Sequence, residues 1–397
     1  MAAAIVQPSL VKPPSAFTKQ AIRQNQDTLM SRIDGAVYSS GDEAIPLVDI
    51  GPSFNGDKAA RRAVAAQIGA ACREIGFFQI TNHGVGLQAR SGVMEQANRF
   101  FHGYPLAKKQ AMHLNHSKLF RGWEPSDASN VNPDDWKDDN GRETKEAFNW
   151  GYEPGLDPTG GDGKYVEMDL EPSPPEGANV WPSEDDLPGF FDAIKHYHWE
   201  VTTLARHLLR LFALSMDLSE THFDKMTTHP GTIARLLYYP PQKARAGPTA
   251  AKDDNEIGLG AHTDYECFTL LLSDSNPGLE VVSLTPDAAT GRPKWISAPA
   301  RPDTLTVNIG DFFQRWTNGR YKSTIHRVVN RSPEKERYSV PFFFSINYDE
   351  KVSTLPTCIS GDEMSHFNEI QAGPWVLERL RSTLKEAAEE YHHSEGL

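Results

Sequence analysis

The chain has 397 residues, of which 39% are hydrophobic and 23% are charged. This is the composition of a globular protein and not of a disordered chain. The formal net charge of −13 argues against a nucleic acid or an anionic membrane as partner. No run of about 18 apolar residues exists that could span a membrane. The sequence leaves the oligomeric state open.

Cysteine usage and the chain ends bear on location. Cys72, Cys267 and Cys358 are odd in number, lie far apart and form no Cys-x-x-Cys pair. This pattern predicts free thiols in a reducing compartment. The first residues, MAAAIVQPSLVKPPS, lack the basic and apolar regions of a signal peptide. The last three residues differ from the peroxisomal Ser-Lys-Leu signal. We therefore expect a cytoplasmic protein.

The N-terminal part predicts a flexible arm followed by alternating strands and helices. Residues 1–42 are polar and lack periodicity, which is typical of a flexible arm. A short strand is expected at 44–50 and a helix at 58–75, with Asp57 as its cap and Gly76 at its end. A strand at 77–84 and a second amphipathic helix at 86–102 follow.

The middle of the chain changes character. Residues 121–188 are rich in Asp, Asn, Gly, Pro and Trp, and a loop region of this length is usually a lid or a binding loop. Within it, 146–153 reads as a strand. Residues 188–217 form the clearest amphipathic helix, with one continuous apolar stripe.

From residue 232 the periodicity becomes that of short β-strands separated by Pro, Gly, Asp and Asn. Seven or eight such strands predict a sandwich, jelly roll or barrel. Residues 364–393 return to a helical pattern. The expected plan is an arm (1–42), a helical and loop region (43–188), a support helix region (189–231), a β core (232–350) and a helical tail (351–397).

Two histidines and one aspartate predict a metal site. His262 and Asp264 lie two residues apart in a β-like run, so their side chains point to the same face. His326 lies in another β-like run. Two histidines and one carboxylate on neighbouring strands form the facial triad of non-haem Fe(II) oxygenases. A zinc hydrolase with three protein ligands stays chemically possible, and a lone His-x-Asp pair is more often a surface pair.

A second set of residues predicts a carboxylate-binding site. Arg337 and Ser339 are again two residues apart on a strand. An arginine matches a carboxylate with two parallel hydrogen bonds, and the alternative is an ion pair within the protein. Tyr239 offers a phenol to the same carboxylate, or it is a core aromatic whose hydroxyl contacts water.

Four segments of the sequence resemble the isopenicillin N synthase-like branch of the 2-oxoglutarate/Fe(II)-dependent dioxygenases. The resemblance rests on "IPLVDI" with "GFFQITNHGV", on "YYPP", on "HTDYECFTLLL" and on "IHRVVN…RYS", in that order. It implies a double-stranded β-helix (jelly-roll) core with flanking N- and C-terminal helices, in an α+β fold.

The resemblance also implies cofactors and site residues. Fe(II) would be held by His262, Asp264 and His326, and 2-oxoglutarate by the cofactor-binding residues Arg337, Ser339 and Tyr239. With O₂, such an enzyme hydroxylates, desaturates or cyclises a small metabolite and releases succinate and CO₂, commonly in specialised metabolism. Many relatives have Asn where this chain has Leu237, and leucine cannot make the side-chain hydrogen bond of that Asn. The substrate-side candidates are Arg121, Phe148, Phe268 and Phe344.

Two other functions stay open. An iron oxidase without 2-oxoglutarate, or an ethylene-forming enzyme, would use the same ligands. A non-catalytic jelly-roll binding protein would keep these residues as structural contacts, although its site should have lost at least one ligand.

Overall fold

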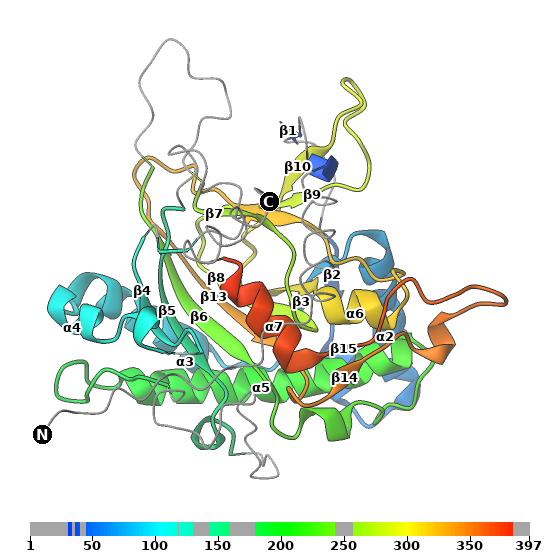
Figure 1. The fold of residues 1–397 in the computed structure, drawn as a ribbon, viewed down its shortest axis with the longest axis horizontal. Helices are drawn as coiled ribbons and strands as arrows, with labels where there is room; N and C mark the ends of the chain where they lie inside the picture. The colour runs from blue at the N-terminus through cyan, green and yellow to red at the C-terminus, as the bar shows by residue number, and fades with distance from the viewer. Residues whose placement is uncertain are drawn as a thin grey trace, which may run out of the picture.

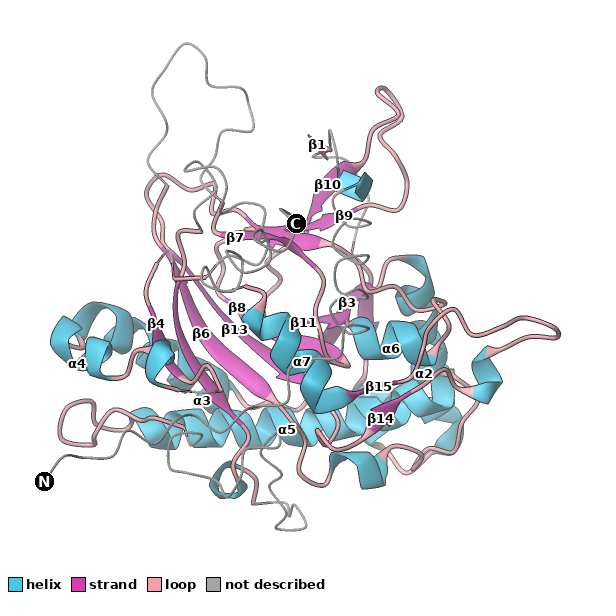
Figure 2. Cartoon of the chain, in the orientation of Figure 1, coloured by secondary structure: helices cyan, strands magenta, loops and turns pink. Residues whose placement is uncertain are grey.

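The computed structural model describes residues 31–33, 36–39, 45–117, 119–126, 128–129, 143–158, 179–242 and 257–383. Two β-sheets form the core, and helices cover one face of the larger sheet (Figures 1 and 2). This is the jelly-roll core with flanking helices that the sequence predicted.

The larger sheet has eight strands in the order β2-β3-β11-β8-β13-β6-β5-β4. All neighbours are antiparallel except β2 and β3. Its strands are β2 (Leu47–Asp49), β3 (Phe77–Thr81), β4 (Gly122–Glu124), β5 (Glu146–Gly151), β6 (Ile233–Tyr239), β8 (Phe268–Ser273), β11 (Leu305–Ile309) and β13 (Arg337–Phe344).

The smaller sheet has five strands in the order β1-β10-β9-β12-β7. Its strands are β1 (Val37–Ser39), β7 (Leu259–His262), β9 (Leu279–Val282), β10 (Lys294–Ser297) and β12 (His326–Val328). A separate hairpin-like pair joins β14 (Lys351–Val352) and β15 (Ile370–Gln371). β7 is the last strand of its sheet, so one of its edges has no strand partner among the described residues.

Three long helices pack on the face of the larger sheet that lies away from the smaller one. They are α2 (Lys58–Glu74), α3 (Leu87–Asn98) and α5 (Phe190–Ser215). In Figure 1, α5 runs beneath the strands of the large sheet. The shorter helices and turns are α4 (Leu106–Ala111), α6 (Asp311–Trp316), α7 (Ala372–Arg381), η1 (Gly51–Phe54), η2 (Arg99–Gly103), η3 (Leu114–His116), η5 (Pro154–Leu156), η7 (Asp224–Thr227) and η8 (Pro356–Cys358).

Helix α2 forms as its sequence predicts. The Asp57 carboxylate accepts a hydrogen bond of 2.8 Å from the Ala59 N–H, which caps the first turn. Its buried stripe includes Val64 and Ile68. Gly76 ends the helix with a φ of +73°, a conformation that favours glycine.

Successive side chains along β13 in the large sheet point alternately into two environments. In β13, Arg337, Ser339, Pro341 and Phe343 face a pocket between the sheets, while the intervening residues pack in the core against the helices. This alternation decides which residues reach the site.

Several sequence predictions need qualification. Residues 37–39 form a strand although 1–42 was expected to be an arm; most of that arm lies outside the described residues. The expected C-terminal helix begins at 372 and not at 364. Parts of the expected lid, 130–142 and 159–178, also lie outside the described residues.

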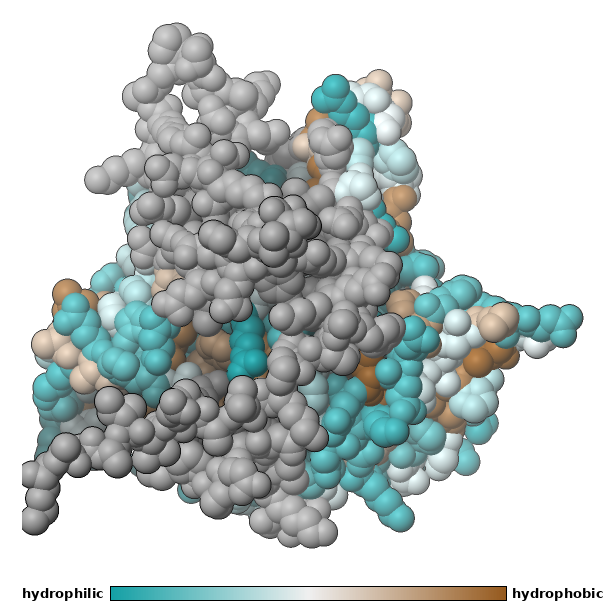
Figure 3. Space-filling model, viewed as in Figure 1, coloured by the Kyte–Doolittle hydropathy of each residue, from teal (hydrophilic) through white to brown (hydrophobic). Residues whose placement is uncertain are grey.

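Hydrophilic residues predominate on the coloured surface seen in Figure 3. Among the described residues, no helix combines the length and the hydropathy needed to cross a bilayer.

Candidate active site

The structure brings His262, Asp264 and His326 together. His262 ends β7, His326 begins β12, and the two are paired across the strands. The Asp264 Oδ1 atom lies 3.5 Å from His262 Nε2 and 3.6 Å from His326 Nε2. All three side chains are buried, and their ligand atoms lie within 4.8 Å of one another. Within the described part of the chain, no other group of three His, Cys, Asp or Glu side chains has this arrangement.

Backbone carbonyls orient both imidazoles. His262 Nδ1–H donates to the Gly260 carbonyl at 2.8 Å, and His326 Nδ1–H donates to the Thr324 carbonyl at 3.1 Å. Both Nε2 lone pairs are therefore directed at the same point as the aspartate. Such outer partners are the usual means of fixing a metal-binding histidine.

Two hydrogen bonds hold the Asp264 carboxylate. Its Oδ2 atom accepts from the Thr269 hydroxyl and from the Asn308 side-chain amide, which leaves Oδ1 to face the histidines. Burial opposes the charged form, but the adjacent His326 and the hydrogen bonds hold the pKa of Asp264 well below its usual range.

Metal ligation by histidine requires a neutral imidazole. Burial, helped by the adjacent His262, lowers the pKa of His326 to about 4. Two imidazole nitrogens and one carboxylate oxygen that face one point fit a divalent transition metal with open coordination positions. The donor set therefore fits Fe(II).

Arg337 lies at the other end of the pocket and has no acidic partner. It is 1% exposed and donates to the hydroxyls of Ser339 and Ser273, at 3.1 and 3.2 Å. Among the described residues, no carboxylate lies within ion-pair distance of it, and its Nε atom has no hydrogen-bond partner. A buried guanidinium of this kind fits an anionic ligand.

Tyr239 lies beside Arg337. Its ring is 5.2 Å from the guanidinium carbon, and its buried hydroxyl makes no hydrogen bond of normal geometry to the described residues. Tyr238 points to the opposite face of β6, where it stacks on Phe101. Arg337, Ser339 and Tyr239 are therefore brought together on the pocket face.

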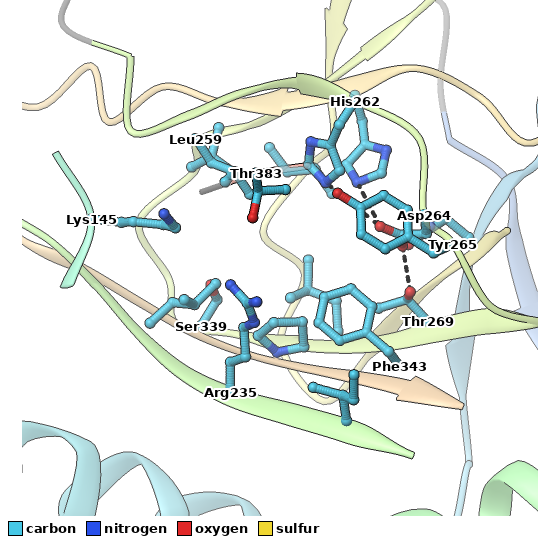
Figure 4. A pocket seen from close by; sticks show the side chains of 18 of the residues that line it. Lys145, Arg235, Leu259, His262, Asp264, Tyr265, Thr269, Ser339, Phe343 and Thr383 are labelled. Atoms are coloured by element: carbon cyan, nitrogen blue, oxygen red, sulfur yellow. Dashed lines mark hydrogen bonds and ion pairs between the residues drawn. The ribbon is translucent and has the colours of Figure 1, made fainter. Parts of the chain in front are cut away.

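The pocket connects these two ends. Figure 4 shows Lys145, Arg235 and Phe343 directed into it from the large sheet, with Thr383 on the opposite side. Its apolar lining includes Ile233, Leu237, Leu271, Pro341 and Leu380, and its polar lining also includes Glu266, Tyr265 and Asn308.

The aromatic substrate candidates are not among the residues that line this pocket, so their contact with a substrate stays a prediction. Phe148, Phe268 and Phe344 are buried in the core layer beneath the sheet. Phe344 and Phe268 lie opposite each other on β13 and β8, and both face the helices. Because strand residues alternate, Phe343 faces the pocket instead.

Arg121 is also absent from the pocket lining. Its guanidinium lies against Gly151, and its positive charge acts on Glu266, which does line the pocket. Burial raises the pKa of Glu266 well above its usual value, although Arg121 opposes this. One oxygen of Glu266 has no hydrogen-bond partner among the described residues.

Sequence reasoning missed Lys145, Arg235 and Glu266. The sequence did carry a signal for Arg235. It lies four residues before Tyr239 on β6, and residues an even number apart on a strand point to the same face. No comparable signal marks Lys145, because it lies just before β5 and its pairing with Glu143 and Glu124 depends on the folded chain.

Residues 230–346 match the model of the 2OG-Fe(II) oxygenase superfamily, and residues 45–184 match that of the non-haem dioxygenase in morphine synthesis N-terminal family. A 2-oxoglutarate-Fe(II) type oxidoreductase of Metarhizium majus is 35% identical over 337 residues, which cover 85% of this chain and 86% of the relative. This chain belongs to the 2OG-Fe(II) oxygenase superfamily.

Further similarities extend over most of this oxygenase. Clavatol oxidase of Penicillium crustosum is 33% identical, with 88% of this chain and 98% of the relative covered. A Neurospora crassa protein crystallised with alpha-KG (2-oxoglutarate) and thymine is 26% identical, with a TM-score of 0.70 and coverage of 87% and 98%. The chain is accordingly an Fe(II)- and 2-oxoglutarate-dependent oxygenase.

Proposed function

We propose that this oxygenase binds Fe(II) through His262, Asp264 and His326 and uses it to oxidise a small organic metabolite. The observation that carries the proposal is the convergence of two Nε2 atoms and one carboxylate oxygen on one end of a buried pocket. The bound metal, with 2-oxoglutarate and O₂, supplies the oxidising chemistry, and succinate and CO₂ are released.

The 2-oxoglutarate is proposed to lie between the metal site and Arg337. Arg337 and Ser339 would bind its distal carboxylate, and the Tyr239 hydroxyl would donate a further hydrogen bond. The Arg337 Nε atom and the Tyr239 hydroxyl, which have no hydrogen-bond partner among the described residues, support this assignment. Leu237 also lines the pocket, where its side chain contributes apolar contact and no hydrogen bond.

The substrate is proposed to be a small molecule with an apolar body. The lining supports this, because Phe343, Pro341 and Leu380 provide apolar contacts while Arg235 offers hydrogen-bond donors. Relatives named for clavatol oxidation, and a neighbour crystallised with thymine, act on or bind compounds of this size. The reaction is hydroxylation, desaturation or cyclisation in specialised metabolism.

We further propose a cytoplasmic enzyme without a nucleic-acid partner. The net charge of −13 supports the exclusion of nucleic acid. All three cysteines are buried free thiols, as a reducing compartment favours.

The first test is anaerobic. Adding Fe(II) to metal-free protein and then 2-oxoglutarate should give the weak visible charge-transfer band of a chelated 2-oxo acid. The His262→Ala variant should not give it. Iron binding without the band would favour an oxidase that does not use 2-oxoglutarate, and failure to bind iron would favour a non-catalytic binding protein.

If the band forms, ethylene and succinate are measured after O₂ is admitted. Succinate without ethylene is expected from an enzyme that oxidises a separate substrate. Ethylene as the main product would identify an enzyme that fragments 2-oxoglutarate itself.

A further inference from the structure

A cluster of four charged residues lies between the large sheet and the metal-bearing strand β7. Lys145 Nζ is 2.7 Å from Glu143 Oε2 and 2.9 Å from Glu124 Oε1. Arg235 Nη1 lies 3.5 Å from the other oxygen of Glu124. The side chains of Lys145, Glu143 and Glu124 are at most 3% exposed, so these three charges lie in a buried site.

Lys145 and Glu124 stay charged. Burial favours neutral Lys145, but Glu124 and Glu143 outweigh this effect and raise its pKa. Burial likewise opposes the charge of Glu124, yet Lys145 and Arg235 hold its pKa well below its usual range. Buried ion pairs are often no more stabilising than apolar residues of the same volume. Stability alone therefore gives little reason for four charges here.

The connection to the iron site runs through Glu143. While its Oε2 atom accepts from Lys145, its Oε1 atom accepts a hydrogen bond of 2.9 Å from the Gly260 N–H. Gly260 lies on β7, the edge strand of the small sheet. Glu143 thus supplies the acceptor that a neighbouring strand would otherwise give to this buried N–H.

Gly260 in turn orients an iron ligand, since its carbonyl accepts the Nδ1–H of His262 at 2.8 Å. Lys145, Glu143, Gly260 and His262 therefore form one continuous series of hydrogen bonds of 2.7 to 2.9 Å. The counterpart at His326 differs: the Thr324 hydroxyl donates to the Ile75 carbonyl, and no charged side chain takes part.

We propose that Glu143 and Lys145 are positioning residues that hold the iron ligand His262 in its binding orientation. The inference rests on the proposed function, because it takes His262 as a ligand. It assigns a role to a charged cluster that also lines the pocket through Lys145 and Arg235. Removing a residue that orients a metal ligand through hydrogen bonds typically lowers metal affinity about 10- to 100-fold.

Metal binding in the Glu143→Leu variant tests the proposal directly. Co(II) is titrated into metal-free protein, and its dissociation constant is expected to rise about 10- to 100-fold. The ring N–H protons of the two Co(II)-bound histidines give separate paramagnetically shifted NMR signals. The His262 signal should shift and exchange faster with water, while the His326 signal should stay in place.

Two further variants test the individual links. Glu143→Gln keeps an acceptor for the Gly260 N–H and should restore most of the affinity. Lys145→Met leaves Glu143 without its ammonium partner and should weaken Co(II) binding in the same direction. These two variants keep the test informative if Glu143→Leu does not fold.

A matched control comes from another buried acid. Asp157 is 3% exposed and is paired with Arg206 at 2.8 Å, but it does not line the pocket. Asp157→Asn should leave Co(II) affinity and both histidine signals unchanged even if it lowers the melting temperature.

The outcomes separate the two ideas. If wild-type protein binds no Co(II), the proposed metal site itself fails. If wild-type protein binds Co(II) and the folded Glu143 and Lys145 variants bind it equally well with an unchanged His262 signal, the positioning role is overturned. Equal movement of both histidine signals would also overturn it, because it would indicate a general loosening of the site.

Discussion

Two arginines on the pocket face of neighbouring strands differ in their surroundings. Arg337 is almost fully buried and is held by two serine hydroxyls. Among the described residues, the Arg235 guanidinium has a 3.5 Å contact with Glu124 and its Nε atom has no hydrogen-bond partner, and the side chain is 17% exposed. Rigid placement suits an invariant cosubstrate, and the looser arginine suits the substrate.

Replacing Arg337 by Met should weaken 2-oxoglutarate binding about 100- to 1,000-fold, because a charged contact in a dry pocket is lost. Metal affinity should not change, since Arg337 is not among the clustered metal donors. Anaerobic titration of the Fe(II) protein, followed by the charge-transfer band, measures both. An unchanged 2-oxoglutarate affinity would show that the clamp is assigned to the wrong residue.

Replacing Arg235 by Met should impair the response to the substrate and not the binding of 2-oxoglutarate. The affinity for 2-oxoglutarate should stay at the wild-type value, while the stimulation of succinate release by the substrate should be lost. The same titration and a succinate assay report the two effects. A loss of 2-oxoglutarate affinity as large as that in Arg337→Met would contradict the division of roles.

At the scale of elements, the sequence predicted most strands and helices but not which face each residue takes. The triad could be predicted because His262 and Asp264 are two residues apart on a strand, so their relative direction follows from local geometry. The direction of the Phe268 and Phe344 side chains could not be predicted, because which face a strand residue takes depends on the neighbouring strands. The C-terminal half of β13 is apolar on both faces, so its pattern there does not distinguish the pocket from the core.

The buried charges were unpredictable for a different reason. Glu143 and Gly260 are separated by 117 residues and meet only because the edge of β7 lies against the start of β5. A single sequence carries no signal for that contact. Lys145 and Glu143 read, in isolation, as part of a solvated charged loop.

The end of α2 offers a test at this scale. At Gly76, an added Cβ atom would lie 2.0 Å from the Lys322 carbonyl oxygen, and φ is +73°. Gly76→Ala should therefore destabilise the protein by at least about 1 to 3 kcal/mol. Gly56→Ala is the matched control, since nothing lies within 4 Å of its Cβ position. Urea unfolding that gives equal midpoints for the two variants would contradict this explanation.

At the scale of the whole molecule, the proposed iron ligands come from the small sheet and its loop, whereas the carboxylate clamp comes from the large sheet. Ligands that contact both sheets should raise the free energy of unfolding, because unfolding separates the sheets. Binding to the folded state alone adds stability according to ligand concentration.

Mn(II) with 2-oxoglutarate should therefore raise the melting temperature more than Mn(II) alone. At 100-fold excess over its dissociation constant, a single ligand adds about 2.7 kcal/mol. EDTA should reverse the gain, and His262→Ala should show none of it. Calorimetry under anaerobic conditions measures the shift. Equal stabilisation of wild type and His262→Ala would show that the metal binds elsewhere.

The alternation along β13 also limits how such an enzyme can diverge. Inserting or deleting one residue between Arg337 and Phe343 would exchange the pocket side chains with those that pack on the helices. Length changes are therefore tolerated only outside this strand, and new substrate preferences must arise by replacing side chains at alternate positions. An alignment of this chain with its relatives should then have no gap across β13. Within this strand, amino-acid differences should be concentrated at positions 341 and 343.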